Sequence, residues 1–296
     1  MESDRKRKRS ADSNELNAAL LRKKAEAFQR KKRNKAVIID TLASCETLAQ
    51  LFGLGRTHMY MLPAWTPRPC DEWKPTIQRM HMLPVSVEII GTDCVTIAKD
   101  LAKKTDARVW MLNMACASSP GGGTRKGCNA QEEHLCRCSD LLPQLEAAAT
   151  NAFPLHAVRR AGKDFKVLVH KRVTFFKDPQ NYSDLIIKEW FRTGVITAAA
   201  ENISKTDGDA RKTGPNAERF INYLLEIIQM QGGTHVILSA WGCGAFGQSA
   251  HAVAEIFRRG LARFDGRSFP KVVFAIIDDH NSAPPGNLHA FKTVFA

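Results

Sequence analysis

Long hydrophobic runs are missing from this sequence of 296 residues. The longest apolar stretches have the length of a strand, such as Val272–Ile277. A membrane-spanning helix needs roughly 20 consecutive apolar residues. The charged N-terminus also lacks the apolar segment of a secretory signal peptide. We therefore expect an intracellular protein that makes no contact with a membrane.

Cysteine is also sparse. The chain has 8 Cys, too few at this length for a scaffold held together by disulfides, and without a secretory signal we expect reduced thiols. There is no internal repeat. A chain of this length is long enough to bury a sizeable core in one large domain or two small ones.

Positive charge is plentiful but uneven. The whole chain has 43 Lys and Arg against 30 Asp and Glu, a net charge of +13. Residues 1–38 hold 13 basic and 5 acidic residues and carry +8 of it, while the remaining 258 residues carry +5. We therefore predict two parts: a basic tail at 1–38, partly disordered or helical, and a domain at 39–296 that begins with accessory helices.

The basic tail has more than one interpretation. Its basic clusters are Arg5–Arg9, Arg22–Lys24 and Arg30–Arg33. They are compatible with a nuclear import signal, with an arm that contacts nucleic acid weakly, or with a solubilising disordered terminus. The first interpretation predicts a nuclear protein, and the others leave a cytoplasmic one.

The pattern along the chain predicts the fold class. We expect residues 1–12 to be disordered, helices over 14–33 and 37–52, and then a loop containing Pro63, Pro67, Pro69 and Pro75. After that loop, strand patterns alternate with helix patterns, which indicates an α/β fold with a mixed or largely parallel sheet between helices. The expected strands are 85–90, 108–114, 167–176, 195–200, 235–239 and 272–277, and the expected helices are 92–103, 130–151, 217–231, 249–264 and 288–295.

Two glycine-rich loops follow predicted strands. The first contains Gly121, Gly122 and Gly123 and leads to Gln131, Glu132 and Glu133 at the start of a predicted helix. Consecutive glycines let a backbone approach a ligand closely, although a flexible loop before an ordinary helix start explains them as well.

The second loop, Ala240–Gly247, lies between a predicted strand and the helix that starts near Ser249. Backbone N–H groups at such a turn form an anion site, and the spacing fits neither a dinucleotide fingerprint nor a P-loop. The loop therefore predicts phosphate binding and does not by itself indicate NAD binding or ATP hydrolysis.

Together, these motifs resemble the poly(ADP-ribose) glycohydrolases of the macrodomain superfamily, in particular their microbial-type branch. Three Gly, seven intervening residues and Gln-Glu-Glu form the signature. The segments that match it in order are Leu112–Gly123, Ala130–Cys136, Ile196–Ala200, Leu238–Gly247 and Phe274–Asp278. The resemblance spans roughly residues 39–296. Ser119 departs from it, because the branch often has Asn before the Pro.

The resemblance implies a macrodomain-like three-layer sandwich with an N-terminal helical extension, and a cleft for ADP-ribose. The loop Gly242, Cys243, Gly244, Ala245, Phe246 and Gly247 would hold the diphosphate, with Phe246 against the distal ribose. Gly121 to Gly123 would cover the scissile ribose, with Asn113 and Gln131 beside them. The candidates for adenine contacts are Asp93, Asp278 and Asn287, for which helix capping and loop contacts are equally good explanations.

The implied reaction is hydrolysis of ribose–ribose bonds, which commonly uses carboxylates around an oxocarbenium-like transition state. Adjacent side chains on a helix point about 100° apart, so Glu132 and Glu133 cannot flank one bond as a facing pair. The resemblance makes Glu133 the general acid and base, and Glu132 the residue that hydrogen-bonds the ribose. No cofactor is expected. The expected partners are poly(ADP-ribose) or ADP-ribosylated proteins, and we expect a monomer.

Other interpretations of the same residues are weaker. Cys128, His134, Cys136 and Cys138 have the wrong spacing for a metal site, and core cysteines explain them better. No local pattern pairs Cys116 or Cys243 with a His, and His280 fits a loop residue better than a general base. Two other functions stay open: removal of mono(ADP-ribose) from protein or nucleic acid, and ADP-ribose binding without catalysis.

Overall fold

The computed structural model describes residues 2–53, 55, 57–62, 82–104, 106–159, 162–204 and 212–296. Its strands are β1 (Thr57–Leu62), β2 (Val87–Ile90), β3 (Val109–Met114), β4 (His156–Arg159), β5 (Gly162–Phe175), β6 (Phe191–Ala198), β7 (His235–Leu238) and β8 (Lys271–Ala275). Its helices are α1 (Glu2–Phe52), α2 (Cys94–Ala102), α3 (Gln131–Cys138), α4 (Leu141–Ala152), α5 (Ala217–Gln231), α6 (Ala250–Leu261) and α7 (Asn287–Phe295), with short 3₁₀ helices η3 (Thr124–Lys126) and η4 (Ile187–Glu189).

The strands form one mixed sheet in the order β1-β5-β6-β3-β7-β8-β2, with β4 paired to β5. From β6 to β2 all neighbours are parallel, whereas β5 is antiparallel to β1, β4 and β6. The parallel half is built from strand–helix–strand units, so the loops that follow β3, β7 and β8 leave the sheet at the same edge. The mixed sheet predicted from the sequence is confirmed.

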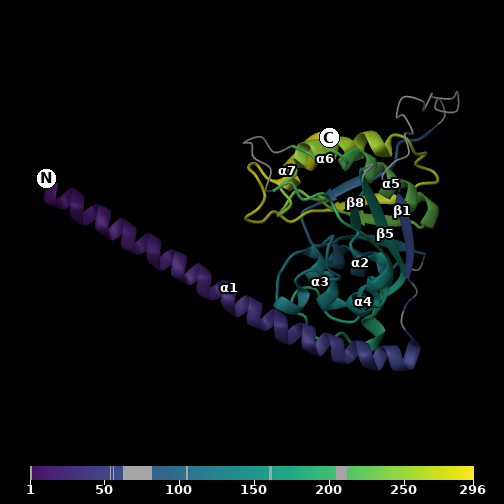
Figure 1. The fold of residues 1–296 in the computed structure, drawn as a ribbon, viewed down its shortest axis with the longest axis horizontal. Coiled ribbons are helices and arrows are strands. Elements are labelled where there is room, and N and C mark those ends of the chain that lie inside the picture. The colour runs from purple at the N-terminus through teal and green to yellow at the C-terminus, as the bar shows by residue number, and fades with distance from the viewer. Residues whose placement is uncertain are drawn as a thin grey trace.

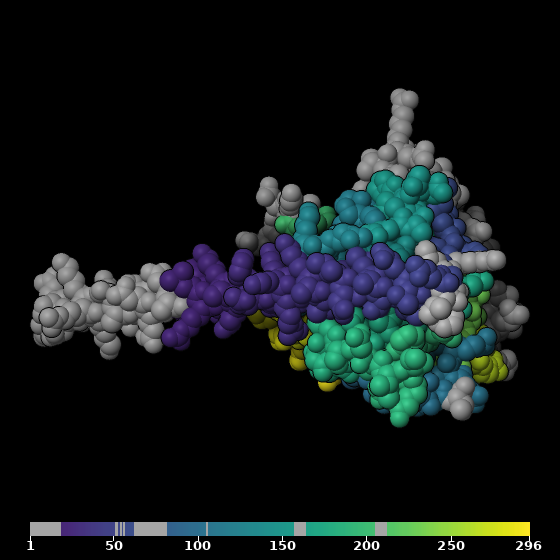
Figure 2. All heavy atoms as spheres, turned by 90° about the horizontal axis from the view of Figure 1, so that it is seen from below, coloured from purple at the N-terminus to yellow at the C-terminus, as the bar shows by residue number. Residues whose placement is uncertain are grey.

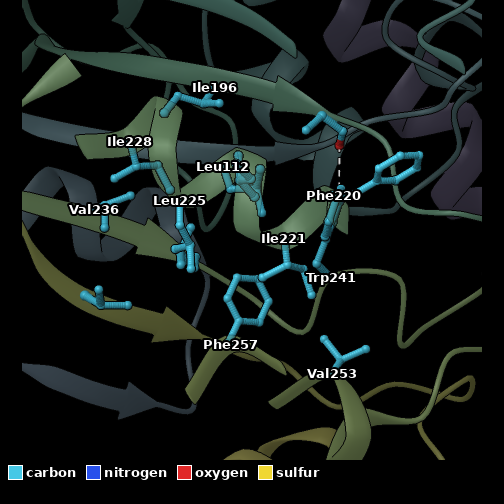
Figure 3. Packing of buried hydrophobic residues seen from close by; sticks show 14 of the residues in the cluster. Leu112, Ile196, Phe220, Ile221, Leu225, Ile228, Val236, Trp241, Val253 and Phe257 are labelled. Atoms are coloured by element: carbon cyan, nitrogen blue, oxygen red, sulfur yellow. Dashed lines mark hydrogen bonds between the residues drawn. The ribbon is translucent and has the colours of Figure 1, made fainter. Parts of the chain in front are cut away.

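Helices cover both faces of the sheet (Figure 1). In β3 and β8, alternate side chains enter different cores, as the two-residue period of a strand requires. One core contains Phe220 of α5, Phe257 of α6 and Phe291 of α7 (Figure 3 shows part of it). The other contains side chains from α1 to α4. The molecule therefore has the expected three layers.

α1 differs from its prediction. It is one helix from Glu2 to Phe52, so residues 2–12 are helical and no break separates 14–33 from 37–52. The reason is that residues 1–52 contain neither Gly nor Pro and are rich in helix formers, and the helix ends at Gly53, whose φ is 71°. The helix also runs through the predicted boundary at residue 38. Asn34 and Ile38 are buried against the domain, while the described part before them projects beyond it (Figures 1 and 2).

Several other elements differ in extent. The helix predicted over 130–151 is two helices, because Ser139 is extended and pairs with Phe175. β1 and β4 were not predicted, and β6 begins four residues before the expected 195. The four prolines of the predicted loop lie outside the described residues. No helix in the described part of the chain combines the length and apolarity that crossing a membrane requires.

Candidate active site

A cavity of about 500 Å³ opens at the carboxyl ends of the parallel strands. This is the position at which open α/β sheets bind ligands, and the volume is that of a pocket for a nucleotide-sized molecule. Its walls come from the ends of β3, β6, β7 and β8 and from the starts of α2, α3 and α7. The lining residues used below are Asp93, Asn129, Ala130, Gln131, His134, Tyr182, Gly242, Gly244, Ala245, Phe246 and Asn287.

The loop after β7 forms one wall of the cavity. Gly242 has φ 80°, and a Cβ there would lie 2.8 Å from the Cβ of Ala200, so a larger residue does not fit. Among the described residues, the N–H groups of Gly244, Ala245 and Phe246 donate no hydrogen bond to the protein. α6 begins just beyond, capped by Ser249. Free amides before a helix N-terminus suit a phosphate, and phosphate binding by this loop stays a prediction.

The glycine-rich loop after β3 folds back onto the start of α3. Gly121 and Gly122 have φ values of 67° and 53°, which favour glycine. A Cβ on Gly121 would lie 2.4 Å from Leu142, and one on Gly123 would lie 2.4 Å from the Sγ of Cys128. Backbone conformation therefore favours glycine at 121 and 122, and close packing requires it at 121 and 123.

Gln131 and Glu132 are fixed by the end of β3. The Gln131 amide accepts a hydrogen bond from Met114 N (2.8 Å) and donates one to Leu112 O (2.7 Å). The Glu132 carboxylate accepts hydrogen bonds from Cys116 N (2.8 Å) and the Asn113 side chain (3.2 Å). Burial raises the pKa of Glu132 from 4.5 to about 8. At pH 7 the protonated form of this carboxyl is therefore favoured.

Glu133 turns back toward the loop. Its Oε1 accepts a hydrogen bond from Gly123 N (2.9 Å), and its Oε2 accepts one from Ala130 N (2.8 Å). A Cβ on Gly122 would lie 2.9 Å from Oε2 of Glu132 and 2.9 Å from Oε1 of Glu133. The two oxygens are thus no further apart than twice that distance. The side chains leave the helix in different directions, as expected, yet both carboxylates end against one glycine.

The candidates for adenine contacts have separate surroundings. Asp93 caps α2 through Thr96 N (2.8 Å), and its Oδ1 lies 3.5 Å from His134 Nε2. Although burial opposes the change, hydrogen bonds from His134 and Thr96 lower the pKa of Asp93 to about 2. Asn287 begins α7 and lines the cavity. Asp278 accepts hydrogen bonds from Asn287 N and Leu288 N instead, so it holds the first turn of α7.

The structure divides the predicted site residues into two groups. Asp93, Gln131, Gly242, Gly244, Ala245, Phe246 and Asn287 line the cavity. The others do not line it: Asn113, Gly121, Gly122, Gly123, Glu132, Glu133, Cys243, Gly247 and Asp278. Cys243 is fully buried in the core between the sheet and α5 to α7, which leaves only its backbone available to a ligand.

Sequence reasoning missed His134 and Tyr182 as lining residues. Tyr182 Oη lies 2.9 Å from His134 Nδ1, and the Tyr182 ring is contacted by the guanidinium groups of Arg137 and Arg33. Tyr182 has φ 63°, a conformation that nothing in the local sequence signals. Arg33 lies on α1, so the N-terminal helix reaches the rim of the cavity.

The cysteines noted in the sequence do not form a metal site in the described residues. No group of three His, Cys, Asp or Glu there is arranged to hold a metal ion. Cys136 and Cys138 are fully buried in the apolar core that also contains Leu135 and Leu141.

The fold and the cavity together define a macrodomain-like protein with a pair of buried carboxylates beside a nucleotide-sized cleft. The family is narrower than that class. The model of the family described as "Microbial-type PARG, catalytic domain" matches residues 18–178, and the chain belongs to this family of poly(ADP-ribose) glycohydrolases. The match begins within the segment that we predicted to be a tail.

Solved structures agree with the family assignment. The poly(ADP-ribose) glycohydrolase of Thermomonospora curvata bound to the inhibitor ADP-HPD has a TM-score of 0.66 and 25% identity, over 89% of this chain and 99% of that one. The Deinococcus radiodurans enzyme in complex with ADP-ribose has a TM-score of 0.56 and 27% identity, over 74% and 86% of the two chains. Among curated proteins, none matches the sequence.

Proposed function

We propose that this chain is a poly(ADP-ribose) glycohydrolase that hydrolyses ribose–ribose O-glycosidic bonds and releases ADP-ribose. The convergence of the Glu132 and Glu133 carboxylates on Gly122, beside a cavity of about 500 Å³, carries the proposal. Membership of the family and the likeness to structures with ADP-ribose or ADP-HPD bound support the same activity.

The proposed substrate position follows the cavity walls. The diphosphate lies against the free N–H groups of Gly244, Ala245 and Phe246, with the Phe246 ring against the distal ribose. Adenine lies at the end lined by Asp93 and Asn287. The distal ribose then lies toward Ala130 and Gln131, where the glycine-rich loop brings the two carboxylates to the scissile bond.

The proposed chemistry uses one proton donor. Glu133 gives a proton to the leaving ribose oxygen as the C–O bond breaks and its electron pair stays on that oxygen. Water then attacks the oxocarbenium-like carbon and returns a proton to Glu133. The backbone amides of Gly123 and Ala130 fix the Glu133 carboxylate in position. The neutral Glu132 hydrogen-bonds the ribose hydroxyls and adds no second negative charge.

The test is incubation of automodified poly(ADP-ribose) polymerase with the wild type and with Glu133→Gln. Glu88→Gln, an exposed carboxylate on β2, is the matched control. We expect the wild type and the control to shorten the polymer and release ADP-ribose, and Glu133→Gln to lose roughly 100- to 10,000-fold in kcat. The proposal is refuted if the polymer persists in the presence of micromolar wild-type enzyme. If the wild type instead clears only a protein with single ADP-ribose groups, the enzyme is a mono(ADP-ribosyl) hydrolase.

The monomeric state, the nucleic-acid contact and the cellular location stay predictions. We propose ADP-ribosylated proteins as partners, since they carry the polymer. A fluorescent fusion with and without substitutions in Arg5–Arg9 would test the nuclear import signal.

A further inference from the structure

α1 lies directly against the glycine-rich loop. A Cβ on Gly127 would lie 2.4 Å from Lys31 O and 3.2 Å from Lys35 Cγ, so the helix touches this glycine. Asn34 is 1% exposed and donates to Gly127 O (3.3 Å) and Asn129 Oδ1 (3.4 Å). The loop that carries the three glycines is therefore enclosed between α3 on one side and α1 on the other.

Only a few residues separate the Glu133 carboxylate from the surface of α1. Gly123 N donates to Glu133, and Lys126 N donates to Gly123 O (2.9 Å). Gly127, the next residue after Lys126, touches α1. Consider a polymer whose terminal sugar lies at Glu133 and which leaves the site across this loop. It passes Lys126 first and α1 next.

Exposed lysines occupy this side of α1. Lys24, Lys31 and Lys35 are spaced by seven and four residues, and at about 100° per residue they fall within one narrow face of the helix. Lys35 and the backbone of Lys31 mark that face as the one beside Gly127. We call Lys24, Lys31, Lys35 and Lys126 the lysine row. All four are exposed, and no carboxylate among the described residues forms an ion pair with them.

We propose that the lysine row binds the phosphates of the poly(ADP-ribose) chain on the leaving side of the scissile bond. The inference rests on the proposed function, because it takes that polymer as the substrate. Each polymer unit brings a diphosphate with about two negative charges, and unpaired lysines attract such a chain. The cleft itself holds one ADP-ribose unit by backbone amides. The lysine row adds affinity that increases with chain length.

The test compares two triple variants, each built on Glu133→Gln so that the polymer is not consumed. The first, Lys24→Gln with Lys31→Gln and Lys35→Gln, removes the α1 part of the row. The matched control, Arg22→Gln with Lys23→Gln and Arg30→Gln, removes the same charge from residues at least 80° away from the row around the same helix. Binding of purified poly(ADP-ribose) of defined length, of ADP-ribose and of single-stranded RNA is measured at several salt concentrations.

We expect the row variant to bind the polymer more weakly, with a slope of log affinity against log salt that is shallower by about 2, at ~0.7 per lysine. The control triple should keep the parent slope, and ADP-ribose should bind all three proteins equally. The double variant Lys24→Gln with Lys31→Gln leaves the packing of Lys35 on Gly127 intact. It should show two thirds of the effect, which separates charge from any disturbance of the loop.

Three outcomes overturn the inference. Equal slopes for the row variant and its parent mean that the lysines do not contact the polymer. An equal loss in the control triple means that only overall charge matters. An RNA affinity that equals the polymer's and falls with it means that the row is a nucleic-acid-binding surface. Failure of the proposed function would be recognised by a different result. The wild-type enzyme would leave the polymer intact, whatever the salt dependence of polymer binding.

Discussion

Replacing Glu132 by Gln is expected to remove a large part of the pH dependence of stability. Glu132 is 2% exposed, and burial raises the pKa of its carboxyl from 4.5 to about 8. A carboxyl whose pKa is higher in the folded state stabilises the fold through its protonated form. That contribution is complete below about pH 4.5 and is lost as the pH rises toward 8.

The size of the effect follows from the shift. Each pKa unit corresponds to about 1.4 kcal/mol, so this one group lowers the free energy of unfolding by about 3 kcal/mol between pH 5 and pH 8. The Gln side chain has the same shape without the charge. Asn113 Oδ1 has no hydrogen-bond partner among the described residues, so the amide of Asn113 can rotate and accept a hydrogen bond from the NH₂ group that Glu132→Gln introduces.

The assay is denaturant unfolding of the wild type, Glu132→Gln and the exposed control Glu88→Gln at one-unit steps from pH 5 to pH 8. Burial also raises the pKa of Asp140, to about 6, but that group is present in all three proteins and cancels in the differences. The stability of Glu132→Gln relative to wild type should rise by about 3 kcal/mol across the range. If the difference in unfolding free energy between Glu132→Gln and wild type is the same at every pH, the raised pKa of Glu132 is refuted.

Two further substitutions test the loop. Gly122→Ala places a methyl group 2.9 Å from both carboxylates, so kcat should fall about 100-fold while ADP-ribose affinity changes little. Gly232→Ala, at a φ of 64° with open space around it, controls for backbone strain, and an equal loss of kcat there would contradict the reasoning. Asn34→Ala removes two long hydrogen bonds to Gly127 and Asn129 and should lower the unfolding free energy by about 1 kcal/mol and also lower kcat. Unchanged turnover of Asn34→Ala would show that α1 does not position the loop.

Periodic segments bounded by clear signals could be predicted from the sequence. The helix over 217–231 has the predicted bounds, because its apolar spacing is regular and Gly232 ends it. Asp93 caps α2, which is the alternative role that we predicted for it from the sequence. β1 was missed because its residues, THMYML, lack clear alternation, and its pairing with β5 is a contact between distant parts of the chain.

The candidate site was predictable in its motifs and less so in its geometry. The two glycine loops and Gln131–Glu133 stood out by composition and spacing. That Glu132 is buried, or that Cys243 faces the core, depends on tertiary packing that no local pattern records. Tyr182 reaches the cavity through a left-handed backbone conformation, and Asn34 reaches the loop from 93 residues away in sequence. Neither has a local signal.

The continuity of α1 changes what its positive charge does. A disordered arm must give up conformational freedom each time it wraps a partner, and that loss weakens binding. A helix anchored at Asn34 holds Lys24 at a set distance, about 15 Å along the axis at 1.5 Å per residue. The positive charges of α1 therefore lie at fixed distances from the site of cleavage. A polyanion can bind them without the loss of conformational freedom that a disordered arm would suffer.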